Sequence, residues 1–366
     1  MPKEGGVLLL GNHISWIDWA ILQASFDRCI RFVMNRDLYN LPFYKPFLKF
    51  FGVIPISPKS AKESLKAVRE ALRSGEVVCI FPEGTISYTG NLNSFKKGFE
   101  IALRGLDDVK VMAFYIKGIW GSVFSRAQNK KREILRREIT IVYEESRKID
   151  VFSLKCQISK LSSFAYVRGK RDLKEFESER IFEILNISKG DGVLSSYQSE
   201  PILDKKFSKN IAFYKDACKE IAKRNISYLF ADSYFVKSAL NDFSIHPLYL
   251  DSLKYIFVFE KIDRDVVEAF EKKFRKKIYL GYRFRDVLVT LNLPDVMETA
   301  YFRVQIASKE GSFGKPISGA GVSVRKRGKE LTFGGTGEIW VRSYEYDWIW
   351  SGDFGYLDRE CFLYIK

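Results

Sequence analysis

Short apolar runs recur through the first part of the chain, and a polar break follows each of them. These runs predict β-strands at residues 7–10, 30–34, 77–81, 111–116 and 139–143. Segments with helical spacing lie between them, most clearly at 16–25 and 61–72. Alternating strands and helices are typical of the α/β fold class, so we expect a mostly parallel β-sheet flanked by helices.

Residues 41–51 are dense in aromatic rings and lysines. One interpretation is an ordinary helix that packs on the core through its apolar face. The other is an interfacial patch that admits a fatty chain or lies against a bilayer. The pattern alone leaves both interpretations open.

Charged residues dominate from 148 to 189, with helical spacing at 176–185. A chain of 366 residues is long enough for two domains with cores of their own. We therefore predict a first domain at 1–170, a linker at 171–190 and a second domain at 191–366.

A polar pair, Asn12 and His13, ends the first apolar run. Ser15 is a suitable N-cap for the helix that follows, which places Asp18 in its first turn. Because His13 lies outside that helix, its ring can fold back onto the Asp18 carboxylate. A carboxylate that fixes the imidazole tautomer leaves the other ring nitrogen to deprotonate a hydroxyl.

The same residues also have a purely structural interpretation. Ser15-x-x-Asp18 is a capping-box pattern, in which Asp18 satisfies a backbone donor at the start of the helix. A second polar break favours the chemical interpretation, because Glu83 and Gly84 follow the strand predicted at 77–81. Ligand sites form at the carboxyl ends of parallel strands, where both breaks would lie.

Two motifs in this order resemble the first and third blocks of the glycerolipid (lysophospholipid) acyltransferases. They are Asn12-His13-x4-Asp18 and, about 65 positions later, Phe81-Pro82-Glu83-Gly84-Thr85. The resemblance implies that His13 is the general base and that Asp18 orients it. It also implies that substrate binding involves a further set of residues: Asn12, Glu83, Gly84 and Thr85.

Residues 52–59 depart from the second block of this family, which usually ends in an arginine that binds substrate phosphate. Lys59 is the candidate phosphate contact here, although a lysine cannot chelate phosphate in two places as arginine does. The Pro-rich segment and the helix after it resemble instead the acyltransferase half of the 2-acylglycerophosphoethanolamine acyltransferase/acyl-acyl carrier protein synthetase family. That arrangement implies a second domain that is related to adenylate-forming enzymes.

The end of the chain carries motifs that resemble those of the adenylate-forming, AMP-binding enzymes, at 311–319, 337–342 and 350–358. In that family the residue matching Asp353 holds the ATP ribose, and an acidic residue matching Asp286 helps to bind magnesium. Here Arg283 and Arg285 flank that acidic position, and the sequence ends before the subdomain that carries the family's catalytic lysine. We therefore expect a partial, degenerate α/β domain with a vestigial nucleotide site and no acyl-activating ligase activity.

The amino-acid composition limits the classes of partner that we expect the protein to bind. The 60 Lys and Arg exceed the 45 Asp and Glu, and the formal net charge of +15 suggests an anionic partner. Aromatic rings interleaved with basic residues favour a phospholipid surface over nucleic acid, for which no motif is visible. Five scattered cysteines indicate a reduced, cytoplasmic chain, and only two histidines exclude a histidine-rich metal cluster. No apolar run approaches the ~20 residues needed to span a bilayer, so we expect peripheral attachment to the inner face of the cell membrane.

These features predict an O-acyltransferase of phospholipid remodelling. The acyl group would pass from an acyl carrier protein or coenzyme A thioester to the free hydroxyl of a lysophospholipid resembling 2-acylglycerophosphoethanolamine. Direct attack on the thioester requires neither a metal nor a further cofactor. Two alternatives stay open: a 1-acylglycerol-3-phosphate acyltransferase, or an inactive lipid- or carrier-binding remnant of a larger fusion. The intact motifs favour an enzyme, whereas the late start at the first strand and the early end favour the remnant.

Overall fold

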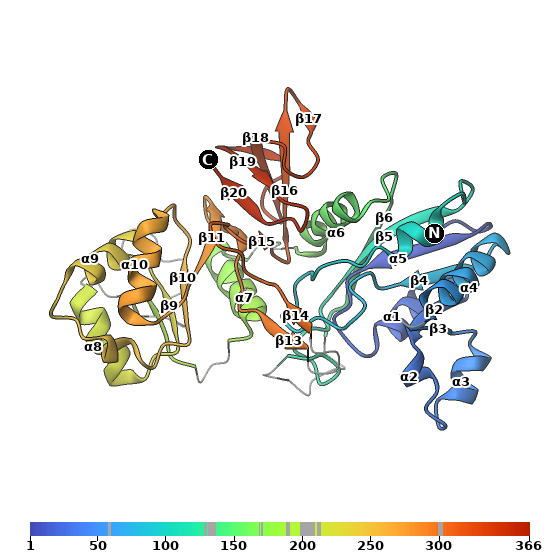
Figure 1. Cartoon of the computed structure of the whole chain (residues 1–366), viewed down its shortest axis with the longest axis horizontal. Helices are drawn as coiled ribbons and strands as arrows, with labels where there is room; N and C mark the ends of the chain where they lie inside the picture. Colours follow the sequence, from blue (N-terminus) through green and yellow to red (C-terminus); the bar gives the residue numbers. More distant parts are fainter. Residues whose placement is uncertain are drawn as a thin grey trace. The chain divides into compact units, whose positions relative to one another are not determined.

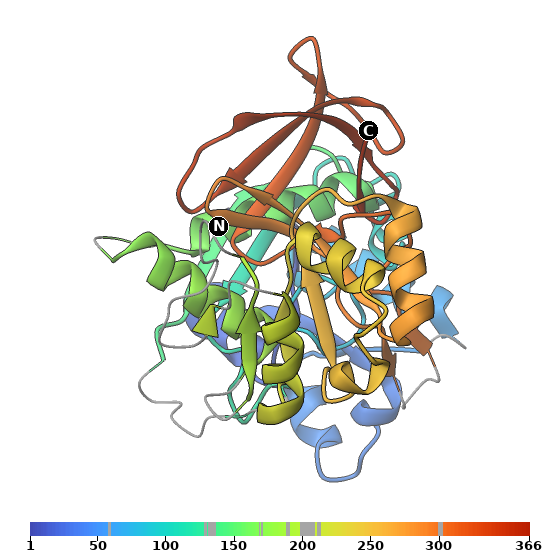
Figure 2. The same cartoon turned by 90° about the vertical axis from the view of Figure 1, so that its left-hand side faces the viewer.

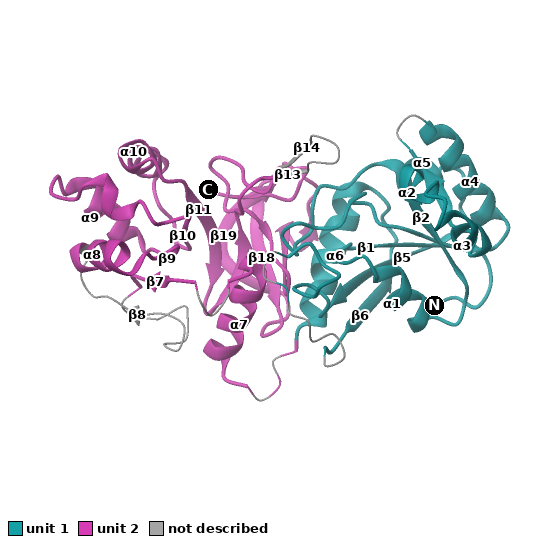
Figure 3. Cartoon of the chain, turned by 90° about the horizontal axis from the view of Figure 1, so that it is seen from below, with its two compact units in different colours: residues 1–166 teal, residues 167–366 magenta. Residues whose placement is uncertain are grey.

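The computed structural model describes residues 1–57, 60–127, 130, 137–167, 169, 171–187, 191–197, 209–210, 214–298 and 303–366. Two compact units make up the chain, unit 1 at residues 1–166 and unit 2 at 167–366 (Figure 3). Across the described residues, no helix combines the length and the hydropathy needed to cross a bilayer.

Unit 1 is built on a six-stranded sheet with the strand order β3-β2-β4-β1-β5-β6. The strands are β1 (Val7–Gly11), β2 (Ile30–Asn35), β3 (Ile54–Ile56), β4 (Val77–Ile80), β5 (Lys110–Lys117) and β6 (Thr140–Glu145). The first five strands in this order pair in parallel, whereas β6 runs antiparallel to β5. The mostly parallel sheet expected from the alternating pattern is confirmed.

Among the described residues, the helices that accompany this sheet are α1 (Asp18–Ser25), α2 (Arg36–Tyr39), α3 (Lys45–Phe50), α4 (Ala61–Arg73), α5 (Gly98–Leu103) and α6 (Val151–Ala165). In α4 the apolar residues recur at helical spacing, so Leu65, Val68 and Leu72 are buried together while the opposite face is charged. The core of the sheet is fully apolar along β1, whose residues from Val7 to Leu10 are at most 1% exposed. A strand buried on both faces explains the unbroken apolar run in the sequence.

The predicted N-cap at Ser15 is wrong. Helix α1 begins at Asp18, and its N-cap residue, Ile17, makes no side-chain capping bond. Ser15 instead forms an isolated β-bridge with Ser125, and the amide of Trp16 donates to the carbonyl of Phe124 at 2.9 Å. Long-range pairing therefore extends the turn after β1 and delays the start of the helix.

Unit 2 contains a seven-stranded sheet in the order β15-β12-β11-β10-β9-β7-β8, a five-stranded sheet in the order β17-β16-β18-β19-β20, and the hairpin β13-β14. The first sheet consists of β7 (Val193–Ser195), β8 (Lys209–Asn210), β9 (Tyr228–Phe230), β10 (Tyr255–Val258), β11 (Ile278–Phe284), β12 (Val287–Leu291) and β15 (Lys315–Pro316). The other strands are β13 (Val296–Glu298), β14 (Arg303–Gln305), β16 (Ala320–Lys326), β17 (Lys329–Glu330), β18 (Gly337–Ser343), β19 (Ile349–Leu357) and β20 (Leu363–Ile365).

Helices cover both faces of the seven-stranded sheet (Figures 1 and 2). They are α7 (Leu173–Leu185), α8 (Tyr214–Arg224), α9 (Ser233–Asn241), α10 (Arg264–Phe274) and the 3-10 helix η2 (Pro247–Leu250). Leu229 and Ile256 share one apolar cluster with α8, α9 and α10, whereas Phe230 and Phe257 share another with α7. Alternate side chains of the central strands thus point to opposite helical layers.

The segment expected to be a linker, 171–190, contains helix α7 and belongs to unit 2. Ile181 and Ile184 are buried in its core. The guanidinium of Arg180, also buried, binds Glu177 and donates at 2.6 Å to the carbonyl of Ser318. The high charge of this stretch hid the helix, because part of the charge is paired inside the unit.

Candidate active site

The candidate site of unit 1 lies where two neighbouring parallel strands end. Strands β1 and β4 pair in register, with Leu10 opposite Ile80. Because parallel strands present their carboxyl ends at one edge of a sheet, the turns after β1 and β4 meet there. The first turn carries His13 and the second carries Glu83.

The His13 imidazole is held on two sides. Its Nδ1 lies 2.8 Å from Oδ2 of Asp18, and its ring stacks on Phe81 with the ring centres 4.0 Å apart. The Asp18 side chain is fully buried, whereas the His13 side chain is 21% exposed. With Nδ1 engaged by the carboxylate, Nε2 is the ring nitrogen that can take a proton from a substrate hydroxyl.

Asp18 also supports the turn that carries His13. Its Oδ2 accepts hydrogen bonds from the backbone amides of Ile14 at 2.8 Å and Ser15 at 2.9 Å, and its Oδ1 accepts one from the Ser15 hydroxyl. One carboxylate therefore binds the imidazole and also the amides of the turn before the helix, although Ser15 is not the N-cap. These bonds fix the carboxylate, and the carboxylate in turn fixes the ring.

Asn12 joins the turn to the neighbouring strand β5. Its Nδ2 donates to the carbonyl of Ile116 at 2.9 Å, and its Oδ1 accepts from the amide of Ile116 at 2.7 Å. The side chain is buried, so its amide group is used within the protein. These bonds hold the His13 turn against β5, and a part for Asn12 in substrate binding stays a prediction.

Glu83 reaches across to the same turn. Its Oε1 accepts from the amide of His13 at 2.9 Å and its Oε2 from the amide of Asn93 at 3.0 Å. Burial raises the pKa of Glu83 to about 7, and the two backbone donors oppose that rise. Both carboxyl oxygens therefore serve the protein backbone, and Glu83 is well placed to hold His13 in position.

Gly84 and Thr85 continue the turn after β4. Gly84 is exposed and has a φ of +70°, a conformation that glycine adopts without the strain a side chain would add. Thr85 is partly exposed. The carbonyl of His13 accepts from the amide of Ser87 at 2.7 Å, so the two turns are bonded at both ends. Lys59, the predicted phosphate contact, lies outside the described residues.

Arg126 was not singled out as a site residue by the sequence analysis. Its guanidinium carbon lies 4.2 Å from the ring centre of Tyr88 and 5.4 Å from that of Trp16. These rings belong to the two turns that carry the candidate site. A guanidinium beside these turns can donate two parallel hydrogen bonds to one phosphate group. The bridge between Ser15 and Ser125 joins the neighbouring residue to the turn after β1, and no local pattern predicts that bridge.

The two carboxylates assigned to a vestigial nucleotide site lie in unit 2. Asp353 forms an ion pair with Lys261, and its Oδ2 accepts from the Tyr282 hydroxyl at 2.7 Å. Asp286 accepts from Arg283 at 3.1 Å. Each carboxylate therefore already has a partner within the protein.

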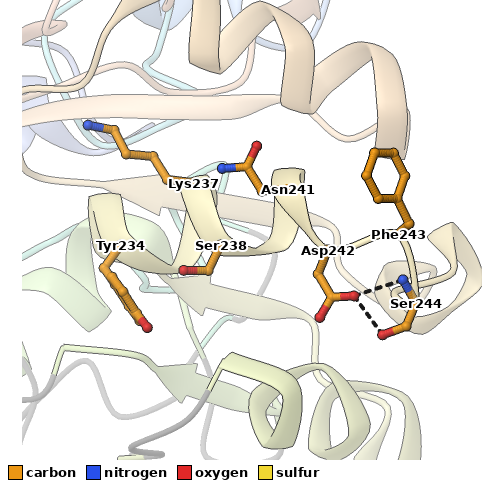
Figure 4. Close-up of a pocket in the computed structure, with 7 residues that line it drawn as sticks. All are labelled: Tyr234, Lys237, Ser238, Asn241, Asp242, Phe243 and Ser244. Atoms are coloured by element: carbon orange, nitrogen blue, oxygen red, sulfur yellow. Dashed lines mark hydrogen bonds between the residues drawn. The ribbon is translucent and has the colours of Figure 1, made fainter.

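Unit 2 also has a surface hollow of about 700 Å³ at the end of α9 (Figure 4). Its lining consists of Tyr234, Lys237, Ser238, Asn241, Asp242, Phe243 and Ser244. Asp242 accepts from the amide and the hydroxyl of Ser244, and Phe243 is almost fully exposed. None of these residues belongs to a predicted site. Among the described residues, no group of three or more His, Cys, Asp and Glu side chains is arranged to hold a metal ion.

Known proteins are similar in sequence to the part of the chain that carries this site. Residues 1–117 match the family model described as Acyltransferase. The chain is 33% identical over 101 residues to the 1-acyl-sn-glycerol-3-phosphate acyltransferase of Borreliella burgdorferi, which is 27% of this chain and 40% of that protein. It is 26% identical over 145 residues to the probable 1-acyl-sn-glycerol-3-phosphate acyltransferase of Mycoplasma pneumoniae, which is 37% of this chain and 53% of that protein. The chain thus spans about half or less of the length of these relatives.

The match to the acyltransferase model lies in the N-terminal part of the chain, which carries the His13 and Glu83 turns. More particularly, the two relatives are named as 1-acyl-sn-glycerol-3-phosphate acyltransferases, in line with the resemblance noted for the Asn-His-x4-Asp and Phe-Pro-Glu-Gly-Thr motifs. Among solved structures, the unliganded o-succinylbenzoate coenzyme A synthetase of Bacillus subtilis is similar with 16% identity and a TM-score of 0.43, over 94% of this chain and 73% of that one. Apo MatB of Rhodopseudomonas palustris gives 12% identity and a TM-score of 0.42, over 100% and 68%. Scores this low do not define either unit, whose folds rest on the elements described above.

Proposed function

We propose that this protein transfers a fatty acyl group from a thioester to the free hydroxyl of a lysophospholipid. The observation that carries this proposal is the contact between His13 and the buried Asp18, at the strand edge of an acyltransferase domain. An imidazole in a fixed tautomer beside a buried carboxylate is suited to general-base catalysis.

In the proposed reaction, Nε2 of His13 takes the proton of the acceptor hydroxyl as its oxygen attacks the thioester carbonyl carbon. The carbon–oxygen bond forms, the carbon–sulfur bond breaks, and the departing thiolate takes the proton back from His13. Asp18 stabilises the positive charge that the ring carries between these two transfers. The reaction requires no covalent enzyme intermediate, metal or further cofactor.

The donor in this proposal is acyl-ACP or acyl-CoA, since both deliver a phosphopantetheine thioester and a net charge of +15 suits an acidic carrier. The acceptor resembles 2-acylglycerophosphoethanolamine and is used in phospholipid remodelling on the cytoplasmic face of the cell membrane. A second candidate acceptor is 1-acylglycerol-3-phosphate, because the relatives that align with the acyltransferase domain are named for that substrate.

The test is a transfer assay with purified protein and radiolabelled acceptors. Lysophosphatidylethanolamine, lysophosphatidic acid and monoacylglycerol are each offered with acyl-ACP or acyl-CoA, and the lipid products are separated. Diacyl phospholipid formed with one phosphate-bearing acceptor would support the proposal and choose between the two candidates. Failure to acylate any acceptor with either donor would contradict it and favour a binding protein.

A further inference from the structure

Helices α2 and α3, with the chain that joins and follows them, form a lobe at residues 36–51 that we call the aromatic lobe. Figures 1 and 2 both show it projecting from the sheet of unit 1. Every residue from 40 to 51 is exposed except Leu48, the single side chain by which α3 packs on the unit. The interpretation of this stretch as a helix packed on the core is therefore wrong for all but that residue.

The exposed side chains of the aromatic lobe are mostly large and apolar. Phe43 and Phe50 are 86% and 84% exposed, and the rest of the set is about half exposed: Leu38, Leu41, Tyr44, Phe47 and Phe51. Some of the rings touch one another, as Phe47 and Phe51 do with centres 4.5 Å apart. Contiguous apolar groups of this kind mark a contact surface.

The charged residues of the aromatic lobe indicate which kind of partner it contacts. Lys45 and Lys49 are exposed among the rings, and no acidic residue occurs from 38 to 62. Aromatic rings at headgroup depth with neighbouring ammonium groups are typical of proteins that lie on anionic lipid.

The aromatic lobe begins at the same sheet edge as the candidate active site. Strand β2, which leads into α2, runs parallel to β4, and β4 runs parallel to β1. The carboxyl ends of all three strands therefore lie at one edge, with His13 after β1 and Glu83 after β4. A lipid contact here would bring the site to the surface on which lysophospholipids reside.

From these observations we infer that residues 36–51 dock the protein onto an anionic phospholipid bilayer, with Phe43 and Phe50 inserted and Lys45 and Lys49 at the phosphates. The inference adds a contact surface to the proposed function, but its test requires no turnover. A second copy of the chain is the competing partner, and its pairing is one outcome of the test.

The test is flotation of the full-length protein with phosphatidylglycerol vesicles and with phosphatidylcholine vesicles. We expect the wild type to float with the anionic vesicles. Phe43→Ser combined with Phe50→Ser should weaken vesicle binding by about tenfold or more, because both rings lose their apolar contact with lipid. Lys45→Glu combined with Lys49→Glu should weaken it most at low salt, since the Debye length is only ~8 Å at 0.15 M.

Two matched controls separate the aromatic lobe from general effects. Phe243→Ser removes an even more exposed ring, 96% exposed, from unit 2. Lys62→Glu combined with Lys66→Glu reverses the same number of exposed charges on α4. Both controls should float as the wild type does.

Three results would overturn the inference. The first is a wild type that does not bind anionic vesicles, and the second is an equal loss of binding in the controls and the lobe variants. The third is a wild-type dimer that the Phe43 and Phe50 substitutions dissociate while vesicle binding is unchanged, because the lobe would then pair two copies. A lobe-specific loss of flotation would support the inference even if no acceptor were acylated.

Discussion

The proposed chemistry depends on His13. Replacing this residue should lower the transfer rate without unfolding the protein. We expect His13→Ala to lower the transfer rate by about 10²- to 10⁴-fold, the usual contribution of a general base. The fold should persist, because the ring is partly exposed and its main packing contact is the stack on Phe81. Transfer kinetics and the far-UV circular dichroism spectrum measure the two effects.

The matched control is His246→Ala, which removes the chain's other histidine, an exposed residue of unit 2. This variant should transfer acyl groups as the wild type does. A folded His13→Ala protein with undiminished turnover would rule out His13 as the base.

Glu83 should make the free energy of unfolding depend on pH. Because burial raises its pKa from 4.5 to about 7, the folded state binds a proton more tightly than the unfolded state between these values. Its contribution to the free energy of unfolding is therefore full below pH 4.5 and is lost as the pH rises through about 7. At ~1.4 kcal/mol per pH unit, the loss amounts to about 3 kcal/mol.

Glu83→Gln removes this titration. The free energy of unfolding of the wild type minus that of Glu83→Gln, measured with denaturant at each pH, should fall by this amount between pH 4 and pH 8. The exposed Glu63 provides the control, since Glu63→Gln should show no comparable trend. A difference for Glu83→Gln that stays constant over the range would contradict the buried, titrating carboxyl.

At this scale the sequence predicted contacts that are local and missed those that depend on strand pairing. His13 and Asp18 are five positions apart, so a turn before a helix was enough to predict their contact. The bonds from the His13 amide to Glu83 and from Asn12 to Ile116 span 70 and 104 positions. They require the register of β1 with its two neighbours, which no pattern of residue types specifies.

At the scale of the elements, the Asn12 side chain ties strand β5 to the turn after β1. Among the side-chain hydrogen bonds described at that turn, no other side chain bonds to β5. Asn12→Ala would leave the buried amide and carbonyl of Ile116 without these bonds. We expect a loss of about 2–4 kcal/mol in the free energy of unfolding, measured with denaturant, and a lower transfer rate because His13 is adjacent.

Asn40→Ala is the control for this substitution, since Asn40 is an exposed residue at the end of α2. Its effect on stability should be within about 0.5 kcal/mol. A loss for Asn12→Ala no larger than that for Asn40→Ala would mean that the two bonds do not hold the turn.

The predicted strands of unit 1 all have counterparts, and the signal is clearest for β1 and β5, whose apolar runs are buried. Strand β6 reverses the direction of the sheet at its edge, which the pattern did not reveal. The domain boundary also differs from the predicted one. Helix α7 carries many charges, yet Glu177 and Arg180 are buried as a pair, so a high charge density did not mean a solvated linker there.

At the scale of the whole molecule, the chain has two units of different character. Unit 1 contains the two stretches that resemble acyltransferase motifs and also the aromatic lobe, whereas unit 2 contains the stretches that resemble motifs of adenylate-forming enzymes. A second activity, in unit 2, would require that Asp353 and Asp286 be available to bind nucleotide and magnesium. Both carboxylates are engaged by cations of the same unit.

We predict that the protein does not activate free fatty acids with ATP. A ribose at Asp353 would compete with Lys261 and with the Tyr282 hydroxyl, whose pKa is raised by burial so that it stays a neutral donor. For Asp286 to assist magnesium it must leave Arg283, and that guanidinium would then repel the metal. Asp353 and Asp286 would each offer one carboxylate contact to the nucleotide or the magnesium. Such contacts cannot replace the disturbed ion pairs and also stabilise a developing adenylate, which needs preorganised groups around the reacting phosphate.

Pyrophosphate release measures this prediction directly. Purified protein with ATP, magnesium and a fatty acid should release no more pyrophosphate than the mixture without protein, and titration calorimetry should detect no ATP binding. Asp353→Asn is the informative comparison, since it should change neither result. Release above background in the wild type that disappears in Asp353→Asn would show that the ion pair opens for nucleotide, and that the second unit is an active acyl-activating domain coupled to the first.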